Sequence, residues 1–410
     1  MKRVVITGMD VITSLGVGKE QLWDKAKKGE SGIDRIQSFD PSPFSTQIAG
    51  EVLEFEPSHY LENKEAKRMD RFSQFAVVTT EMAIKDADLR IEKKNQERIG
   101  VIIGSGVGGM ITAIRGHEGF LEKGPRKVGP FFISSHMMNS AASYISIKTG
   151  VKGPNITIST ACSSGTQAIG VAFNMIRQGH CQVVISGGVD TPVTPFILAG
   201  FCATRALSKN NNDPVMASRP FDKDRDGFVL SEGCGILILE ELKHALKREA
   251  GIKAELIGYG ASSDASHIVV PDADGAILSF QRALKDAGIF PDEIDYINAH
   301  GTSTSLNDRI ETEAIKRVFG DYAYKIPITS IKSSIGHTIG ASGAIGLVAT
   351  ILSMNYNLLL PTINYMTPDP ACDLDYVPNR SRKKEINTAL LNSLSFGGNN
   401  AALIVKKFRP

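Results

Sequence analysis

One stretch decides the fold class: residues 155–178 read NITISTACSSGTQAIGVAFNMIRQ. Its opening residues, 155–159, are rich in β-branched side chains and predict a short strand. From Ser164 to Gln178 the apolar residues recur at helical spacing and predict a helix. A small-residue junction, Thr160-Ala-Cys162-Ser-Ser-Gly165, joins the two. A strand that leads straight into a helix is the repeating unit of an α/β protein.

The same alternation continues on both sides of this stretch. Helices are predicted at 73–87, 275–287 and 341–354, and strands at 4–7, 100–103, 183–186, 235–239, 254–258, 296–299, 326–330 and 401–405. The charged segment 27–72 lacks clear periodicity and is predicted to be a surface excursion. Because residues 328–337 echo the junction at 158–165, we expect two similar α/β halves, 1–250 and 251–410, that pack tightly.

Composition excludes several classes of protein. The 410 residues are 42% hydrophobic and 22% charged, which excludes a disordered chain. A net charge of +2 gives no field that indicates nucleic acid. No run approaches about 18 uninterrupted apolar residues, so no membrane span is expected, and residues 1–8 are too short for a signal-peptide core. Five cysteines without CxxC argue against a disulfide framework and a zinc site and favour the reducing cytoplasm. We expect no metal and no cofactor.

Cys162 is the sharpest chemical feature. It follows a predicted strand and precedes a predicted helix, whose unpaired N–H groups and positive dipole end favour the reactive thiolate. The alternative is a small buried hydrophobe, as most free cysteines are, and position alone does not decide between the two. The other four cysteines are interpreted as packing residues: Cys181, Cys202, Cys234 and Cys372.

Two histidines lie in loops at the ends of predicted strands. His300 follows Asp295-Tyr-Ile-Asn-Ala299, and His337 lies in Lys332-Ser-Ser-Ile-Gly-His337. Small residues surround both, and open α/β sheets form their binding crevices at such strand ends. One histidine in this position is more often structural. Two of them, together with a cysteine between strand and helix, favour a catalytic site.

Two further motifs have simpler interpretations. Residues 104–109 match GxGxxG after a strand, but no acidic residue follows on a second strand, so a packing turn is favoured over a dinucleotide loop. Basic residues gather at Lys64, Lys67, Arg68 and Arg71, with Arg126 and Lys127 further on. They form either a solvated face or a dock for an acidic protein or a phosphate.

Together these motifs resemble the β-ketoacyl-acyl carrier protein synthases, and most closely the synthase II type. The resemblance rests on six segments in order: Thr160-Ala-Cys162-Ser-Ser-Gly, Arg219-Pro-Phe-Asp-Lys-Asp-Arg-Asp-Gly227, Ser231-Glu-Gly-Cys-Gly235, Asn298-Ala-His300-Gly-Thr-Ser-Thr, Lys332-Ser-Ser-Ile-Gly-His337 and Phe396-Gly-Gly-Asn-Asn-Ala. It runs nearly end to end. It implies the thiolase fold, in which duplicated α/β halves form a five-layered core.

The resemblance also implies an acyltransferase reaction in fatty acid biosynthesis. Cys162 would hold the acyl chain, and malonyl-acyl carrier protein would lose CO2 and attack it in a Claisen condensation. His300 and His337 would stabilise the enolate, and Lys332 would support the pair. The backbone N–H groups of Cys162 and Phe396 would bind the acyl oxyanion, with Phe396 also acting as a gate. Thr302 and Thr304 match pantetheine contacts.

Partners follow from the same resemblance. Six basic positions match those that dock the acidic carrier protein: Lys64, Lys67, Arg68, Arg126, Lys127 and Arg205. The family implies a homodimer, or a heterodimer with a chain-length factor.

Some residues depart from synthase II. Gly346 stands where a carboxylate usually pairs the active-site lysine, and Ser395 replaces a gate glycine and should take a positive φ less freely. Several motifs, Gly346 among them, are similar to those of polyketide ketosynthases. A ketosynthase of a type II polyketide or polyene pathway is therefore an alternative function. Two others are a non-catalytic chain-length factor, which usually lacks the nucleophile, and a Cys–His hydrolase.

Overall fold

The fold is built around one mixed sheet in the computed structural model, which describes residues 1–409. Along the sheet the strand order is β11-β10-β14-β15-β9-β1-β8-β7-β5-β6, and β2 pairs with β1. These strands are β1 (Val4–Thr13), β2 (Gly16–Val17), β5 (Ile99–Gly104), β6 (Asn155–Ile158), β7 (Val183–Asp190), β8 (Gly233–Glu241), β9 (Ala254–Ser263), β10 (Tyr296–Asn298), β11 (Ile328–Thr329), β14 (Thr388–Ser393) and β15 (Asn399–Lys406). Two small ribbons complete the strands: β3 (Asp34–Arg35) with β4 (Ile48–Ala49), and β12 (Leu358–Leu359) with β13 (Arg382–Lys383).

The two ends of the sheet repeat one pattern of strand directions. Strands from the first 250 residues form one side and those from the remainder form the other, joined by antiparallel pairing of β1 with β9. Moving outward from this junction, each side has two antiparallel pairings followed by two parallel ones. The parallel strands lie outermost on both sides.

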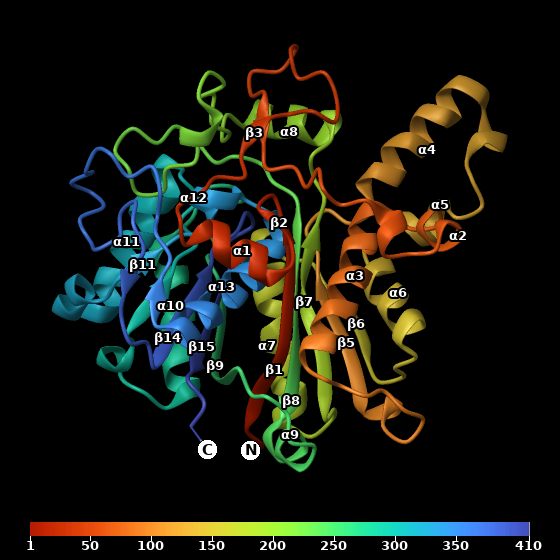
Figure 1. The fold of residues 1–410 in the computed structure, drawn as a ribbon. Coiled ribbons are helices and arrows are strands. Elements are labelled where there is room, and N and C mark those ends of the chain that lie inside the picture. The colour runs from red at the N-terminus through yellow and green to blue at the C-terminus, as the bar shows by residue number, and fades with distance from the viewer. Residues whose placement is uncertain (410) are drawn as a thin grey trace.

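The layers alternate between helices and the two halves of the sheet, one half built from the strands of the first 250 residues and the other from the later strands. Helices α3 (Arg71–Asp86) and α6 (Ser140–Thr149) cover the outer face of the first side, and α10 (Ala273–Ala287) and α11 (Ser305–Phe319) cover that of the second. Between the sides run α7 (Ser164–Arg177) and α13 (Ser342–Tyr356), which contact strands of both (Figure 1). This is the five-layered α/β arrangement of the thiolase fold.

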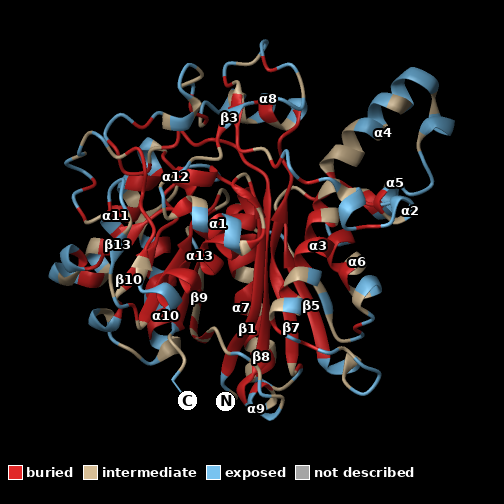
Figure 2. Cartoon of the chain, in the orientation of Figure 1, coloured by how far each residue is buried: buried red, intermediate tan, exposed pale blue. Residues whose placement is uncertain are grey.

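The remaining helices are short or peripheral: α1 (Lys19–Ala26), α2 (Asn63–Ala66), α4 (Met110–Lys123), α5 (Phe132–His136), α8 (Pro195–Thr204), α9 (Leu242–Lys247) and α12 (Lys332–Ile335). Figure 2 shows the central strands and α13 almost wholly buried, whereas α4 projects from the body as an exposed arm. None of the fourteen residues of α4 is buried.

One helical stretch, Ile339–Tyr356, has the length and hydropathy of a membrane span, although its sequence is interrupted by small polar residues. Within this structure 89% of it is buried. Its apolar side chains pack between the two sides of the sheet, as expected for a core helix with two neighbouring layers.

The strands and helices predicted from the sequence all form, with shifted boundaries. Two features differ. Segment 27–72 is not simply a surface excursion, because Ile33, Ile48 and Phe55 are buried and join core clusters. The remaining elements were not predicted, since most are short or have few or interrupted apolar residues: α1, α2, α4–α6, α8, α9, α11 and α12, and strands β2–β4 and β12–β14.

Candidate active site

Cys162 lies in a single 3-10 turn, Ala161–Ser163, between β6 and α7. Ala161 takes φ 51°, a left-handed conformation that costs energy for any residue with a Cβ. The Ser164 hydroxyl holds this turn closed: it donates to the Ala161 carbonyl at 2.6 Å and accepts from the Thr160 N–H at 2.9 Å. The turn therefore presents the Cys162 side chain at the start of α7, as the sequence indicated.

Close packing against β5 fixes where α7 begins. A Cβ on Gly104 would lie 2.3 Å from the backbone carbon of Ser164, so only glycine fits there. The GxGxxG motif is thus a packing loop. Its N–H groups at Gly106 and Val107 donate to the buried carboxylate of Asp190, at 2.8 and 2.9 Å, and are not free for a phosphate.

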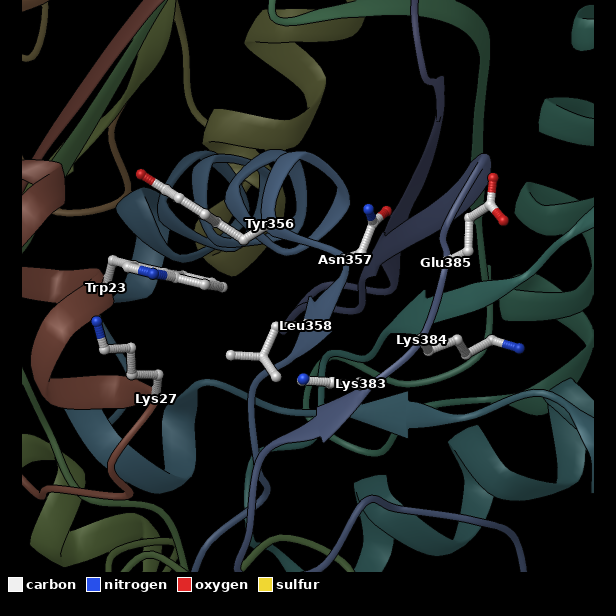
Figure 3. Close-up of a pocket in the computed structure, with 8 residues that line it drawn as sticks. All are labelled: Trp23, Lys27, Tyr356, Asn357, Leu358, Lys383, Lys384 and Glu385. Atoms are coloured by element: carbon white, nitrogen blue, oxygen red, sulfur yellow. The ribbon is translucent and has the colours of Figure 1, made fainter.

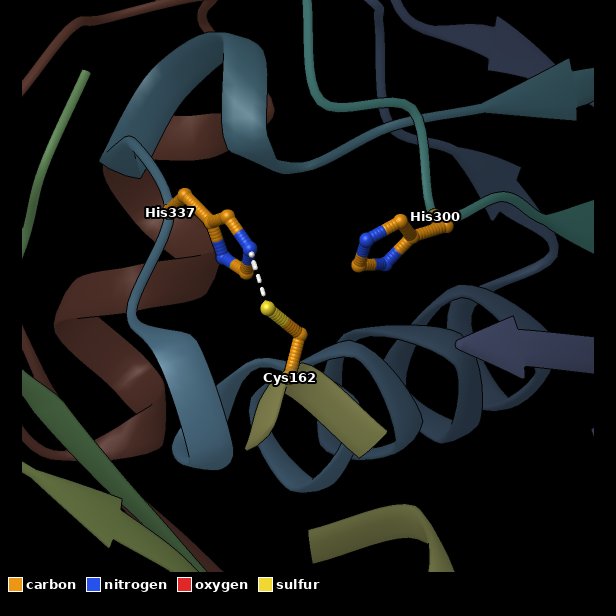
Figure 4. A group of neighbouring side chains, drawn as sticks. All are labelled: Cys162, His300 and His337. Carbon is orange, nitrogen blue, oxygen red and sulfur yellow. Dashed lines mark hydrogen bonds between the residues drawn. The ribbon is translucent and has the colours of Figure 1, made fainter. Parts of the chain in front are cut away.

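Three side chains predicted to work together meet in the structure. The Cys162 sulfur lies 3.1 Å from Nε2 of His337. The rings of His300 and His337 are 5.3 Å apart between centroids and nearly perpendicular, at 85°. Their candidate donor atoms and the sulfur all lie within 4.8 Å of one another. Figure 4 shows the two rings facing each other above the cysteine, which comes from a different half of the chain.

His337 is oriented through its other nitrogen. Nδ1 lies 2.9 Å from the hydroxyl of Ser342, the first residue of α13, and that hydroxyl is 3.1 Å from the Thr338 hydroxyl. A serine hydroxyl can donate or accept. It can therefore support either neutral tautomer of His337, so that Nε2 either accepts a proton or carries one.

His300 is positioned through its backbone. Buried Glu311, on α11, accepts from the N–H groups of His300 at 2.6 Å and Gly301 at 2.8 Å. Nζ of Lys332 donates to the His300 carbonyl at 2.6 Å. Among the described residues no group hydrogen-bonds to Nδ1 of the buried His300 ring. The loop is held firmly while the imidazole remains available to a ligand.

Burial dominates the electrostatics of these groups. It lowers the pKa of His300 and of His337 well below the ordinary value, and the Lys332 charge lowers both further, so both imidazoles are neutral at physiological pH. Burial also lowers the pKa of Lys332, to about 8. Neutral imidazoles can donate to a developing negative charge without adding a net positive charge of their own.

The ionisation of Cys162 differs from the sequence prediction. Burial raises the pKa of its thiol to about 12, although the Lys332 charge and the backbone N–H groups of Phe396 and Cys162 oppose this. The helix end does favour the thiolate, as expected, but loss of solvation outweighs this effect and keeps the thiol protonated. The nearest base is Nε2 of His337, which is placed to take the thiol proton as the sulfur attacks.

The loop after β14 places Phe396 beside the cysteine. The Phe396 and Cys162 N–H groups, which both lower the pKa of the Cys162 thiol, form a pair of donors of the kind that binds an oxyanion. The positive φ angles of this loop belong to Gly397 and Gly398, at 82° and 69°, and not to Ser395. The Ser395 hydroxyl donates to the Asn399 carbonyl at 2.7 Å. The serine thus costs no backbone strain and ties the loop together.

The two threonines lie in the His300 loop, with their hydroxyls 2.9 Å apart. Thr302 is buried, and Thr304 caps α11 by accepting from the Asn307 N–H at 3.3 Å. Gly346 faces the side chain of Asn298, whose amide donates to the Gly346 carbonyl at 3.2 Å. The charge of Glu311 raises the pKa of Lys332, against the larger lowering by burial.

The six basic residues are all exposed and, within residues 1–409, take part in no ion pair. Lys64 and Lys67 belong to α2 and its end, and the guanidinium of Arg68 lies 4.8 Å from the centre of the Phe131 ring. Arg126 and Lys127 follow α4, whereas Arg205 ends α8. Helices α2 and α8 are well separated in Figure 1.

Sequence reasoning missed three polar residues of the site: Asp190, Glu311 and Ser342. Asp190 also accepts from the Ser105 hydroxyl and the Gly340 N–H, both at 2.7 Å, and so joins loops on either side of Cys162. The available signal for Asp190 was a carboxylate at the end of an apolar strand. Glu311 and Ser342 lie on helices and carried no signal of their own.

A groove elsewhere on the surface shares no residue with this site (Figure 3). The Trp23 and Tyr356 rings stack there with centroids 4.7 Å apart. The other residues that line it are Lys27, Asn357, Leu358, Lys383, Lys384 and Glu385. No cysteine, serine, threonine or histidine lines it, and we assign no chemistry to it.

Comparison with known families gives a match over most of the chain. The model of the β-ketoacyl synthase N-terminal domain matches residues 1–245, and that of the C-terminal domain matches 253–366. The chain belongs to the β-ketoacyl synthase family. It is 47% identical over 410 residues to 3-oxoacyl-[acyl-carrier-protein] synthase 2 of Synechocystis sp., covering 100% of this chain and 99% of the relative. The synthase 2 of Coxiella burnetii is 46% identical over 408 residues, covering 99% of each.

Solved structures give the same result. The ishigamide ketosynthase/chain length factor superposes with a TM-score of 0.93 at 37% identity and covers 100% of both chains. A type II polyketide ketosynthase, solved in complex with its acyl carrier protein, gives 0.91 at 36% identity over 99% of this chain and 100% of that one. The predicted resemblance, thiolase fold and acyltransferase class are confirmed. This β-ketoacyl synthase is a condensing enzyme.

Proposed function

We propose that this β-ketoacyl synthase lengthens an acyl chain held on Cys162 by two carbons, using malonyl-acyl carrier protein, in fatty acid biosynthesis. The observation that carries the proposal is the 3.1 Å contact between the Cys162 sulfur and a neutral His337, with His300 facing both. A thiol beside a base can become acylated, and its thioester is then open to attack by a carbon nucleophile.

The first half-reaction is acyl transfer. Nε2 of His337 takes the thiol proton as the sulfur attacks the thioester of the acyl-carrier protein, and the proton then passes to the departing pantetheine thiol. The N–H groups of Cys162 and Phe396 stabilise the oxyanion formed on the acyl carbonyl. Both histidines are neutral again when this step ends.

The second half-reaction is decarboxylation and condensation. The malonyl group loses CO2, and its bonding electrons form an enolate whose oxygen accepts hydrogen bonds from the N–H groups of His300 and His337. The enolate carbon attacks the acyl-enzyme carbonyl, and the carbon–sulfur bond breaks to release the β-ketoacyl product. The departing Cys162 sulfur takes a proton from Nε2 of His337, and a proton from solvent restores the imidazole. The Ser342 hydroxyl supports the His337 tautomer that each half-reaction needs, while Lys332 holds the His300 backbone.

The test uses purified enzyme with acyl- and malonyl-carrier protein. The proposal expects equal amounts of CO2 and β-ketoacyl product. Cys162→Ala should abolish condensation yet retain malonyl decarboxylation, since both histidines remain. Cys202→Ala, which removes a cysteine outside the site, should condense normally. Condensation by Cys162→Ala at the wild-type rate would contradict the assignment of the nucleophile.

The acidic carrier protein is the proposed protein partner. A related ketosynthase forms a complex with its acyl carrier protein. The docking residues on this chain are the exposed basic positions Lys64, Lys67, Arg68, Arg126, Lys127 and Arg205, and Thr302 and Thr304 contact the pantetheine. Their unpaired charges support this role.

A homodimer is the proposed assembly. Apolar side chains more than one-third exposed gather on α4, on α5 and in the turns on either side of α5: Phe120, Leu121, Phe131, Ile133, Met137 and Met138. A second copy that covers this arm would remove them from water.

We place the enzyme in the cytoplasm, which its five free cysteines support. We divide the chain into two halves, 1–250 and 251–410, which the repeated strand directions support.

A polyketide chain is the alternative substrate. It is favoured by the match over nearly the whole chain to a type II polyketide ketosynthase and by Gly346. The higher identity to fatty acid synthases, 46–47% against 36–37%, favours the fatty acid role. Mass spectrometry of the chain released after repeated malonyl addition separates them, because a polyketide retains its keto groups without a reductase.

A further inference from the structure

We propose that Cys162, His300 and His337 also form a binding site for Zn²⁺, and that occupation of this site reversibly stops the enzyme. One thiol and two imidazoles form a donor set characteristic of zinc. All three side chains are at least nine-tenths buried, and their donor atoms lie within 4.8 Å of one another. The loss of activity rests on the proposed function, whereas the coordination does not.

The geometry needs only a small adjustment. Bonds of about 2.3 Å to sulfur and about 2.0–2.1 Å to nitrogen place tetrahedral zinc ligands roughly 3.3–3.6 Å apart. Nε2 of His337 and the Cys162 sulfur, at 3.1 Å, are already near that separation. His300 must close the remainder, by about an ångström. Its ring can turn without breaking a hydrogen bond, because its buried Nδ1 has no partner among the described residues.

The binding step balances without a further reactant. Hydrated Zn²⁺ exchanges water for the two imidazoles and the thiolate, the thiol proton passes to solvent, and one water keeps the fourth position. A coordinating cation deprotonates a thiol outright, so the resting protonated state of Cys162 is no obstacle. The Lys332 ammonium, which acts on all three ligands, opposes a cation and makes binding weaker than in a dedicated structural site.

Zinc binding at this site and catalysis by Cys162 exclude each other. A sulfur bound to zinc cannot attack a thioester, and a sulfur carrying an acyl group cannot ionise to bind zinc. Acyl-carrier protein should therefore protect the enzyme, and chelation should restore it. The same logic separates zinc at this site from zinc bound to exposed residues such as His267, which loading of Cys162 does not affect.

Co²⁺ provides a test independent of turnover, because a thiolate–cobalt bond absorbs in the near-ultraviolet. Chelator-treated wild-type enzyme should show this band at one equivalent of Co²⁺ per chain, and Zn²⁺ should displace it. Cys162→Ala should lose the band, His300→Asn should weaken binding at least roughly tenfold, and Cys202→Ala should match wild type. Acylated enzyme should show no band.

In parallel, stoichiometric Zn²⁺ should inhibit condensation and EDTA should restore it. Absence of the band in wild type, or its persistence in Cys162→Ala, would overturn the metal site even if the enzyme condenses normally. A band that appears in an enzyme unable to condense without metal would instead support the site and contradict the proposed function. Inhibition that acylation fails to prevent would place the inhibitory metal elsewhere and overturn the proposal.

Discussion

Glu311→Gln tests how the fold positions His300. The Glu311 side chain is fully buried, and four N–H donors point at its two oxygens. One oxygen accepts from the His300 N–H at 2.6 Å and the Asn392 amide at 2.7 Å. The other accepts from the Gly301 N–H at 2.8 Å and the Asn307 amide at 3.2 Å. Burial raises the pKa of Glu311, but four donors leave no acceptor for a carboxyl proton, so the carboxylate is the form the structure uses.

The size of the effect follows from these contacts. Glutamine keeps one oxygen and turns an NH₂ group toward two of the four donors. Each hydrogen bond to a charged group contributes about 1.5–3 kcal/mol, so losing two should lower the free energy of unfolding by roughly 3–6 kcal/mol. The displaced His300 should also slow condensation, because an ångström of misplacement can cost on the order of 10²-fold in rate.

Denaturant unfolding and condensation kinetics measure the two effects, with kinetics run where the variant stays folded. Glu313→Gln is the matched control: it lies on the same helix with a side chain 57% exposed and should change stability by no more than about 0.5 kcal/mol. If Glu311→Gln unfolded within about 1 kcal/mol of wild type and condensed at its rate, the reasoning that Glu311 positions the loop would be refuted.

Three further predictions follow. Burial lowers the pKa of Lys332 from 10.5 to about 8, so between those pH values the unfolded chain binds a proton that the folded chain does not. The free energy of unfolding should therefore rise with pH across that window. Lys332→Met should flatten this rise in denaturant titrations. Gly104→Ala should destabilise the protein and reduce condensation, because its Cβ meets the start of α7, whereas Gly200→Ala, with open space around it, should be tolerated in both assays. Reversing the charges of Lys64 and Lys67 together should raise the KM for acyl-carrier protein several-fold in low salt. The rate on a pantetheine substrate, which lacks the carrier protein, should not change. An unchanged KM for acyl-carrier protein would exclude both lysines from the docking surface.

The architecture was largely predictable because its signals are local. Apolar strands and periodic helices each follow from a few neighbouring residues, and Cys162 and His300 lie after strand ends, where crevices form. His337 was also expected at a strand end, but it follows the short helix α12, which separates it from β11. The arm formed by α4 was not predictable, since none of its residues is buried and its pattern reports no core. Its structure depends on contacts that sequence periodicity does not encode.

The site chemistry was harder to predict than the positions of its residues. The helix end next to Cys162 suggested a thiolate, but full burial, a property of the whole fold, reverses that preference. Glu311 and Asp190 reach backbone N–H groups on distant loops, and no spacing in the sequence links a carboxylate to such partners. Electrostatic environment and long-range backbone contacts therefore had to come from the structure.

The central claim is that the Cys162 sulfur carries the growing chain. The most direct measurement is intact-protein and peptide mass spectrometry of enzyme incubated with acyl-carrier protein but no malonyl donor. The account predicts a single acyl group, located on the peptide that contains Cys162, which disappears when malonyl-carrier protein is added. An enzyme that condenses without ever carrying this group, or that carries it on another cysteine, would contradict the account.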